Sequence, residues 1–296
     1  MTATFYWLGV SFAIISGCVN NYGTVLQKKV VNELSDDSKF MRSLVKKPLW
    51  ILGLILGMGV GSCFFLIAQI FIGPALIPGL MASGLIVLAI GSVKIVGEKL
   101  QILEITGITL MILATFLLGI SELAINIAET NLLELGFILR IAIFTALLVG
   151  FSLVLQVCQK RIEKYRGIFL AILSGFMFSL SNFWVGPMMG VIAQVLNGTA
   201  NIGEIILFII SVFILILTNM IGITTIQQAF REGQASNLIP IQQVPIQLTP
   251  ITVYFLIFLL NPPTIFSTIY LIIGIILVLI SSFLLGKRSA QIEEIK

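Results

Sequence analysis

Histidine is absent from this sequence of 296 residues, and aspartate occurs only as Asp36 and Asp37. Metal-dependent and acid–base catalysis need such side chains, so the chain has no credible set of metal ligands or proton-transfer groups inside a membrane. Its serines have no base that could activate them as nucleophiles. We therefore expect no catalytic residues, no cofactor and no enzyme activity.

Charge and cysteine are also scarce. Charged residues make up 10% of the chain, and the basic ones lie between apolar runs, which indicates membrane topology and argues against nucleic-acid binding. Cys18, Cys63 and Cys158 lie in or beside apolar segments without a CxxC spacing, so we interpret them as packing residues. The first apolar run has no preceding Lys or Arg and no cleavage site, and we expect it to be retained as a helix.

Long apolar runs dominate the rest of the sequence. The chain is 58% hydrophobic with a mean hydropathy of +1.11, far above the values of soluble domains. This composition predicts an all-α integral membrane protein. At about 20 residues for each crossing, the length accommodates about nine transmembrane helices. We place them at residues 5–27, 48–71, 74–96, 101–120, 135–157, 167–193, 204–229, 235–260 and 264–286.

The basic residues divide the connections into two groups. If successive connections alternate between the two sides of the membrane, every Lys and Arg except Arg140 falls on one side. The positive-inside rule then predicts a multi-pass protein of the cell membrane, with the N-terminus outside and the C-terminus in the cytoplasm. Residues 31–47 mix apolar and basic side chains, and we expect them to form an amphipathic helix on the inner membrane surface.

A short pattern recurs in the two parts of the chain. Residues 12–17 (FAIISG) are similar to residues 170–175 (LAILSG), and residues 76–78 recur at residues 238–240 as Leu-Ile-Pro. Because one extra helix separates the two blocks, the second block is inverted relative to the first, as in many secondary transporters. The predicted organisation is a first transmembrane repeat at residues 1–121, which includes the interfacial helix at 31–47, a linking helix at 122–165 and a second repeat at 166–296.

Amide side chains within the predicted membrane helices are the main candidates for binding. A single Asn or Gln in such a helix is often a contact between helices, with a coupling of about 0.6 kcal/mol. Here the amides fall on the first, second and third helices of both repeats, which favours convergence on one solute pathway. The sequence identifies no metal ligands. The predicted substrate-binding residues are Asn20, Asn21, Thr24, Gln69, Asn182, Asn219, Gln243 and Gln247.

Proline interrupts one of these helices. Residues 235–250 combine three prolines with three glutamines at the head of an apolar run. Each proline removes a backbone donor, and hydrocarbon cannot satisfy the amides, so we expect a broken helix that faces its neighbours or a water-filled pathway. Residues 73–78 occupy the corresponding place in the first repeat. The predicted helix breaks, with a gating role, are at Pro74, Pro78, Pro240 and Pro245.

Three motifs carry a family resemblance. Residues 16–29 (SGCVNNYGTVLQKK) look like a first-helix pattern that ends in Lys-Lys, and residues 73–78 (GPALIP) look like a proline-bracketed turn. Residues 97–100 (GEKL), followed by Gly107, are similar to the start of the closing helix of an EamA repeat. With these motifs the chain resembles the drug/metabolite transporter (DMT) superfamily, in its EamA and NIPA-like magnesium-transporter branches. The resemblance implies two inverted four-helix repeats, although ten-helix members have one crossing more than we predict.

The resemblance implies a transporter that moves a small polar or cationic solute by alternating access, and it favours magnesium. Mg²⁺ prefers carboxylate oxygens and holds its water tightly, so an amide site would take only a largely hydrated ion. An EamA-type exporter of neutral or zwitterionic metabolites or drugs is the alternative, which an uncharged lining suits better. A membrane enzyme and a scaffold are disfavoured. The expected partners are the ion or small molecule and the lipid bilayer, and a homodimer is left open.

Overall fold

The computed structural model describes residues 3–34, 40–72, 80–81, 83–98, 100–121, 130–262 and 264–293. Within these residues every regular element is a helix, because a backbone in hydrocarbon must satisfy its own polar groups. The main helices are α1 (Ala3–Glu33), α2 (Phe40–Leu44), α3 (Pro48–Leu54), α4 (Ser62–Ile72), α6 (Gly84–Gly91), α7 (Ile102–Ile120), α8 (Leu135–Arg161), α9 (Arg166–Leu196), α10 (Ile202–Glu232), α11 (Ala235–Thr252) and α12 (Ile265–Glu293). Short π-helical stretches extend three of them, namely η1 (Ile55–Gly61), η2 (Ser92–Val96) and η5 (Val253–Ile257).

Several helices are long and apolar enough to cross a membrane. Within the described residues five stretches meet both conditions, and two further apolar helices are shorter. These findings confirm an all-α, multi-pass membrane protein, whereas the full number of crossings remains a prediction. The five stretches are Pro48–Ala68, Leu135–Arg161, Glu163–Leu196, Ile202–Glu232 and Ile265–Leu285, and the shorter helices are Gly84–Val96 and Ile102–Leu118.

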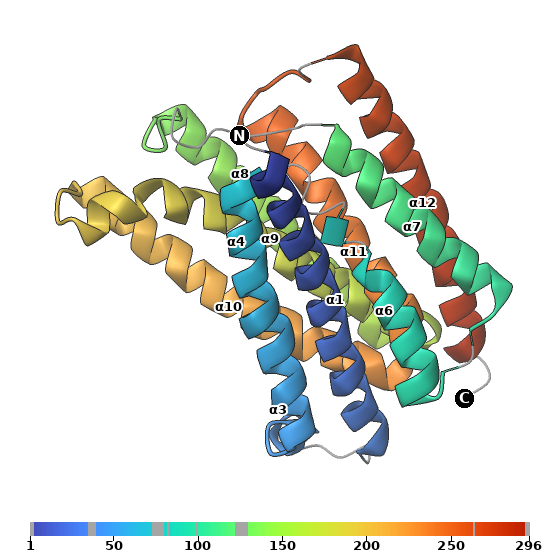
Figure 1. Cartoon of the computed structure of the whole chain (residues 1–296). Coiled ribbons are helices and arrows are strands. Elements are labelled where there is room, and N and C mark those ends of the chain that lie inside the picture. Colours follow the sequence, from blue (N-terminus) through green and yellow to red (C-terminus); the bar gives the residue numbers. More distant parts are fainter. Residues whose placement is uncertain are drawn as a thin grey trace.

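The bundle has two ends, which we name by charge. The basic end holds Lys28 near the end of α1, Arg231 near the end of α10 and Arg166 at the start of α9. We call the other end of the bundle the opposite end. Helices α1, α6, α8, α10 and α12 run toward the basic end, whereas α3 with α4, α7, α9 and α11 run away from it (Figure 1).

We divide the helices by their order along the chain into a first half (α1 to α7) and a second half (α9 to α12). In the first half α1 packs against α3, α4 and α6, and in the second half α9 packs against α10 and α11. Helix α8 lies against α9, and α7 lies alongside α12 (Figure 1). The order of helix directions along the second half is the reverse of that along the first.

Small residues allow these close approaches. A Cβ at Gly17 would overlap the Met81 backbone, and one at Gly84 would overlap the Gly17 carbonyl. In the second half a Cβ at Gly175 would meet the Gln242 carbonyl and the Pro245 ring. In each half these contacts place the third helix directly on the first helix, as the glycine-based packing of membrane helices predicts.

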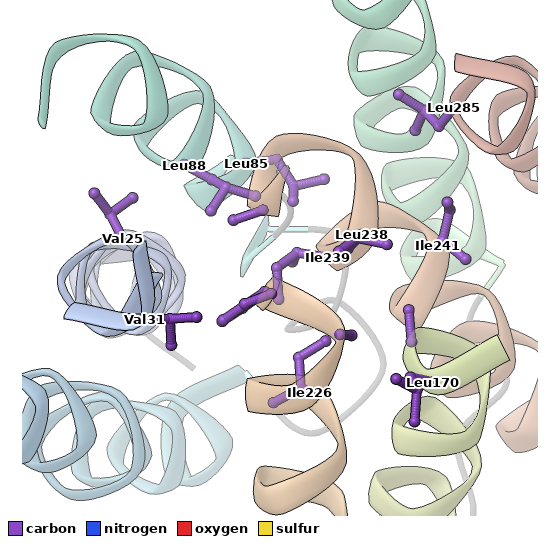
Figure 2. Packing of buried hydrophobic residues seen from close by; sticks show 14 of the residues in the cluster. Val25, Val31, Leu85, Leu88, Leu170, Ile226, Leu238, Ile239, Ile241 and Leu285 are labelled. Carbon is purple, nitrogen blue, oxygen red and sulfur yellow. The ribbon is translucent and has the colours of Figure 1, made fainter. Parts of the chain in front are cut away.

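Among the described residues the apolar core joins the halves at the basic end and along the α7–α12 pair. Figure 2 shows Val31 of α1 pointing toward Ile226 of α10 and Ile239 of α11, and this cluster also includes side chains of α2, α6, α7, α9 and α12. Toward the opposite end the described residues form two separate clusters. One lies within α8, α9, α10 and η5, and the other, around Ala13, lies within α1 and α4.

The prediction of a broken helix at Pro240 and Pro245 needs correction. Helix α11 runs without a break through both prolines, and the Pro245 ring packs into the space that Gly175 leaves on α9. In the predicted interfacial segment at 31–47, α1 continues to Glu33, and Phe40–Leu44 forms a helix whose Phe40 and Leu44 side chains are buried in the basic-end core. Residues 35–39 lie outside the described residues, and the place of this segment on the membrane surface stays a prediction. The predicted breaks at Pro74 and Pro78 lie outside the described residues.

Candidate functional site

The first helix of each half is tied to the second helix by a buried serine. Ser16 Oγ donates a hydrogen bond of 2.7 Å to the Gly61 carbonyl, and Ser174 Oγ donates one of 2.8 Å to the Gly222 carbonyl. Both serines are completely buried. These serines lie in the two copies of the pattern that recurs in the sequence, so corresponding residues make corresponding contacts and fix the amide-bearing faces of α1 and α9.

The α1 candidates lie next to the glycine face of the second helix. Asn20 is exposed in the protein alone, and its side chain lies beside Gly57 and Gly61 of η1. Asn21 Nδ2 donates to the Gly17 carbonyl at 2.9 Å, and Thr24 Oγ1 donates to the Asn20 carbonyl at 3.2 Å, both within α1. Asn20 therefore keeps its amide available to a ligand, whereas Asn21 and Thr24 are partly engaged by their own helix.

The second-half amides divide in the same way. Asn219 on α10 donates to Ser181 Oγ at 2.6 Å and to the Leu215 carbonyl at 2.8 Å, so it is a contact between α9 and α10. Asn182, the next residue after Ser181 on α9, is exposed. Of Asn182 and Asn219, Asn182 is the one exposed in the way expected of a residue that faces a pathway or lipid.

Helix α11 presents its glutamines in different environments. Gln242 is buried and donates to Ser174 Oγ at 2.7 Å, so it is a packing residue. Gln243 and Gln247 are half-buried. The Gln69 side chain lies outside what the structure describes. The eight predicted binding residues thus stay predictions, and among those whose side chains are described Asn20 and Asn182 are the exposed ones.

Polar contacts between the halves lie at the basic end, where the sequence predicted no site. Gln227 Nε2 of α10 donates to Gln27 Oε1 of α1, and both side chains are buried. Further along α10, at its end, the carbonyls of Phe230 and Gly233 accept hydrogen bonds from the Lys28 ammonium. Lys28 is only 4% exposed, so its charge is held almost entirely by protein groups.

Two buried carboxylates of the first half meet the first turn of α11. Glu98 accepts hydrogen bonds from the backbone N–H of Ala235 at 2.8 Å and of Ser236 at 3.2 Å, and from Ser236 Oγ at 2.7 Å. Glu104 is completely buried and accepts from Asn237 Nδ2 at 2.8 Å. Glu98 therefore caps a helix of the other half, where the N-terminal end of the helix dipole favours negative charge.

The sequence analysis placed Lys28 with the other basic residues on the inner side of the membrane, and it used Lys28 and Glu98 only in the motifs of the family resemblance. A usable signal was present, because Lys28 continues the helical face that carries Asn21 and Thr24. Nothing in the sequence indicated their contact partners. Phe230 lies 202 residues from Lys28, and Ala235 lies 137 residues from Glu98. Among the described residues no three His, Cys, Asp or Glu side chains lie together as a metal cluster.

These features define a polytopic α-helical membrane protein with polar residues enclosed between two helical halves. Comparison with protein families identifies its class more closely. The family model described as magnesium transporter NIPA matches residues 4–291, nearly the whole chain, so the protein belongs to this family. The family is one of transporters and not of enzymes, which confirms the expectation from the sequence. Neither the curated proteins nor the solved structures give a match to the chain.

Proposed function

We propose that the protein carries Mg²⁺ across a membrane by alternating access of its two halves. The family supplies the ion, and the one-sided closure of the bundle supports the mechanism. At the basic end one apolar cluster joins α1 and α6 to α10 and α11. Toward the opposite end the α7–α12 pair stays in contact, whereas the other described helices form separate clusters for each half. This is the arrangement expected of a transporter that is closed on one side and able to open on the other.

An inverted repeat would supply the two states of such a transporter. The helix directions reverse between the halves, and the Ser16–Gly61 bond has its counterpart in the Ser174–Gly222 bond. Two halves with the same internal contacts and opposite orientation can exchange conformations, which turns a state open to one side into a state open to the other. The proposed repeats are residues 1–121 and 166–296, with 122–165 as the link.

The orientation follows from the positive-inside rule. We propose that the basic end faces the cytoplasm and that the protein lies in the cell membrane with its N-terminus outside. The state described here is then closed toward the cytoplasm. A homodimer stays a prediction from the sequence.

The amides of α1, α9 and α11 suit a hydrated ion better than a bare one. Mg²⁺ dehydrates reluctantly and is commonly held through its waters. Asn20, Asn182 and Gln243 offer carbonyl oxygens that can accept hydrogen bonds from those waters, and none of them carries a charge that would hold the ion too long. We therefore propose that the ion passes these residues with most of its hydration shell.

A flux assay tests the proposal directly. Purified protein in liposomes that contain a Mg²⁺-sensitive dye should give uptake that saturates with external Mg²⁺ and is absent from protein-free liposomes. Absence of uptake with folded protein in either direction of the Mg²⁺ gradient would refute magnesium transport. Adding Ca²⁺ and Na⁺ in separate samples would show whether the pathway selects for the smaller, tightly hydrated divalent ion.

The uncharged amides favour a second candidate function. An exporter of neutral or zwitterionic metabolites would also use hydrogen-bonding residues without charge. In the same liposomes, uptake of labelled neutral amino acids without any Mg²⁺ uptake would support that function and contradict the first.

A further inference from the structure

Among the described residues, three charged side chains are buried at the basic end, and the first half supplies all three. Lys28, Glu98 and Glu104 are at most 7% exposed. Lys28 binds carbonyls at the end of α10, and Glu98 binds N–H groups at the start of α11. The end of a helix carries partial negative charge and its start partial positive charge, so each side chain meets the helix end that it stabilises.

The connection between α10 and α11 is therefore held on both sides by opposite charges from the first half. The Arg231 guanidinium adds a contact in the reverse direction, because it lies 4.4 Å from the centre of the Phe40 ring. We call this set of contacts the basic-end latch. Its members in the first half are Gln27, Lys28, Phe40, Glu98 and Glu104, and those in the second half are Gln227, Phe230, Arg231, Gly233, Ala235, Ser236 and Asn237.

We propose that the basic-end latch is the cytoplasmic gate of the transporter, and that the α10–α11 connection is the part that moves. The inference rests on the alternating access proposed above and names the contacts that hold one of its two states. Charge-assisted hydrogen bonds are stronger than neutral ones. Lys28 makes such bonds at the end of α10, and Glu98 makes them at the start of α11. Loss of either set of bonds should therefore free the same α10–α11 connection.

The hydrogen bonding around the latch is also incomplete. Three buried side-chain oxygens have no hydrogen-bond partner among the described residues: Gln227 Oε1 and Asn237 Oδ1 of the latch, and Gln234 Oε1 of the α10–α11 connection. A buried polar atom without a partner destabilises the state that buries it. When the α10–α11 connection moves away, water can reach these oxygens and offset part of the bonds that are lost. A gate needs such a balance, because a fully satisfied network would stay closed.

Hydrogen exchange measured by mass spectrometry on the whole chain in lipid nanodiscs tests the gate. We expect Glu98→Gln and Lys28→Met each to accelerate exchange by about tenfold or more, the effect of losing one hydrogen bond to a charged group. The acceleration should cover residues 228–238 and also residues 25–33 at the end of α1, because both sides of an opening gate become accessible. The α7–α12 pair should keep its rate.

A matched control separates gating from the loss of a helix cap. Glu204 closes a capping box with Asn201 at the start of α10, at the opposite end and within one half. Glu204→Gln should accelerate exchange only in the first turn of α10. Ser236→Ala removes only the 2.7 Å hydroxyl contact to Glu98 and should give a smaller acceleration in the same two segments if the stronger variants do not fold.

Acceleration in residues 235–238 alone, or no acceleration in the folded variants, would overturn the gate. The result does not depend on the ion. If the unmodified protein carries no Mg²⁺ but both variants accelerate exchange at α1 and at the α10–α11 connection, the proposed function fails and the gate stands. If Mg²⁺ flux is present but the two segments respond separately, the gate fails alone.

Discussion

Ser281 Oγ donates a hydrogen bond of 2.6 Å to the backbone carbonyl of Gly107, and so joins the last helix of the chain to the last helix of the first half. Ser281 is completely buried. A Cβ at Gly107 would lie 2.7 Å from Leu285 Cγ, and one at Gly274 would lie 2.7 Å from Leu118 Cδ2, so the two helices are in close contact over more than two turns. The α7–α12 pair is thus a second joint between the halves, separate from the basic-end latch.

Ser281→Ala should lower the free energy of unfolding by about 1 kcal/mol, the net value of one hydrogen bond. Its neighbour Ser282 is half-buried, and Ser282→Ala should change stability by less than about 0.5 kcal/mol. Thermal unfolding in detergent micelles measures both. Equal effects of the two substitutions would contradict the role of the Gly107 bond.

The two repeated serines should differ when each is replaced by alanine. Ser16→Ala removes one buried hydrogen bond and should cost about 1 kcal/mol of stability. Ser174→Ala also leaves the buried Gln242 amide without its acceptor, so we expect about 1 to 3 kcal/mol more. Denaturant unfolding of the purified variants gives the comparison, and Ser174→Ala no worse than Ser16→Ala would argue against the Gln242 contact.

Gly84 and Gly150 offer a matched pair for close helix packing. A Cβ at Gly84 would overlap the Gly17 backbone, which cannot move aside as a side chain can, so Gly84→Ala should cost about 1 to 3 kcal/mol. At Gly150 on α8 no atom lies within 4 Å of the added Cβ. Gly150→Ala should therefore leave stability unchanged or raise it by up to about 1 kcal/mol through helix propensity. Unfolding of both variants in the same detergent is the measurement.

Asn182 and Asn219 separate binding from helix packing. Asn182→Leu should leave the free energy of unfolding unchanged, because the exposed amide has no internal hydrogen bond to lose. The substitution should lower Mg²⁺ uptake about tenfold, because it removes one contact to the ligand. Asn219→Leu breaks the bond to Ser181 and should lower stability by about 0.6 kcal/mol or more. Uptake in liposomes and unfolding must be measured on both variants. Lost stability in Asn182→Leu with normal uptake would remove Asn182 from the predicted site.

The sequence predicted the helices where hydropathy alone determines them. The segment predicted at 135–157 is α8 at Leu135–Arg161, and the segment predicted at 204–229 is α10 at Ile202–Glu232. It missed the continuity of α11, because a proline forfeits one hydrogen bond that packing on a neighbouring helix can offset. It also gave no sign of the π-helical stretches, because one additional residue in a turn leaves an apolar run apolar.

The candidate site was predicted less well, for a physical reason. Asn20 and Asn182 were recognised because an amide within an apolar run stands out locally. Lys28 and Glu98 border connections, where charge is ordinary, and only their burial by residues distant in sequence makes them unusual. Burial of that kind depends on which helices meet, and single-sequence patterns do not contain this information.

The distant partners of Lys28 have a consequence for biosynthesis. The ribosome must add more than two hundred residues after Lys28 before the carbonyls of Phe230 and Gly233 exist. During that time the basic end of the first half lacks the helix ends that cover it, and Lys28 must reside in the headgroup region or be shielded by the insertion machinery. Closure of the basic end is therefore a late event in synthesis, although the contacts within the first half can form earlier.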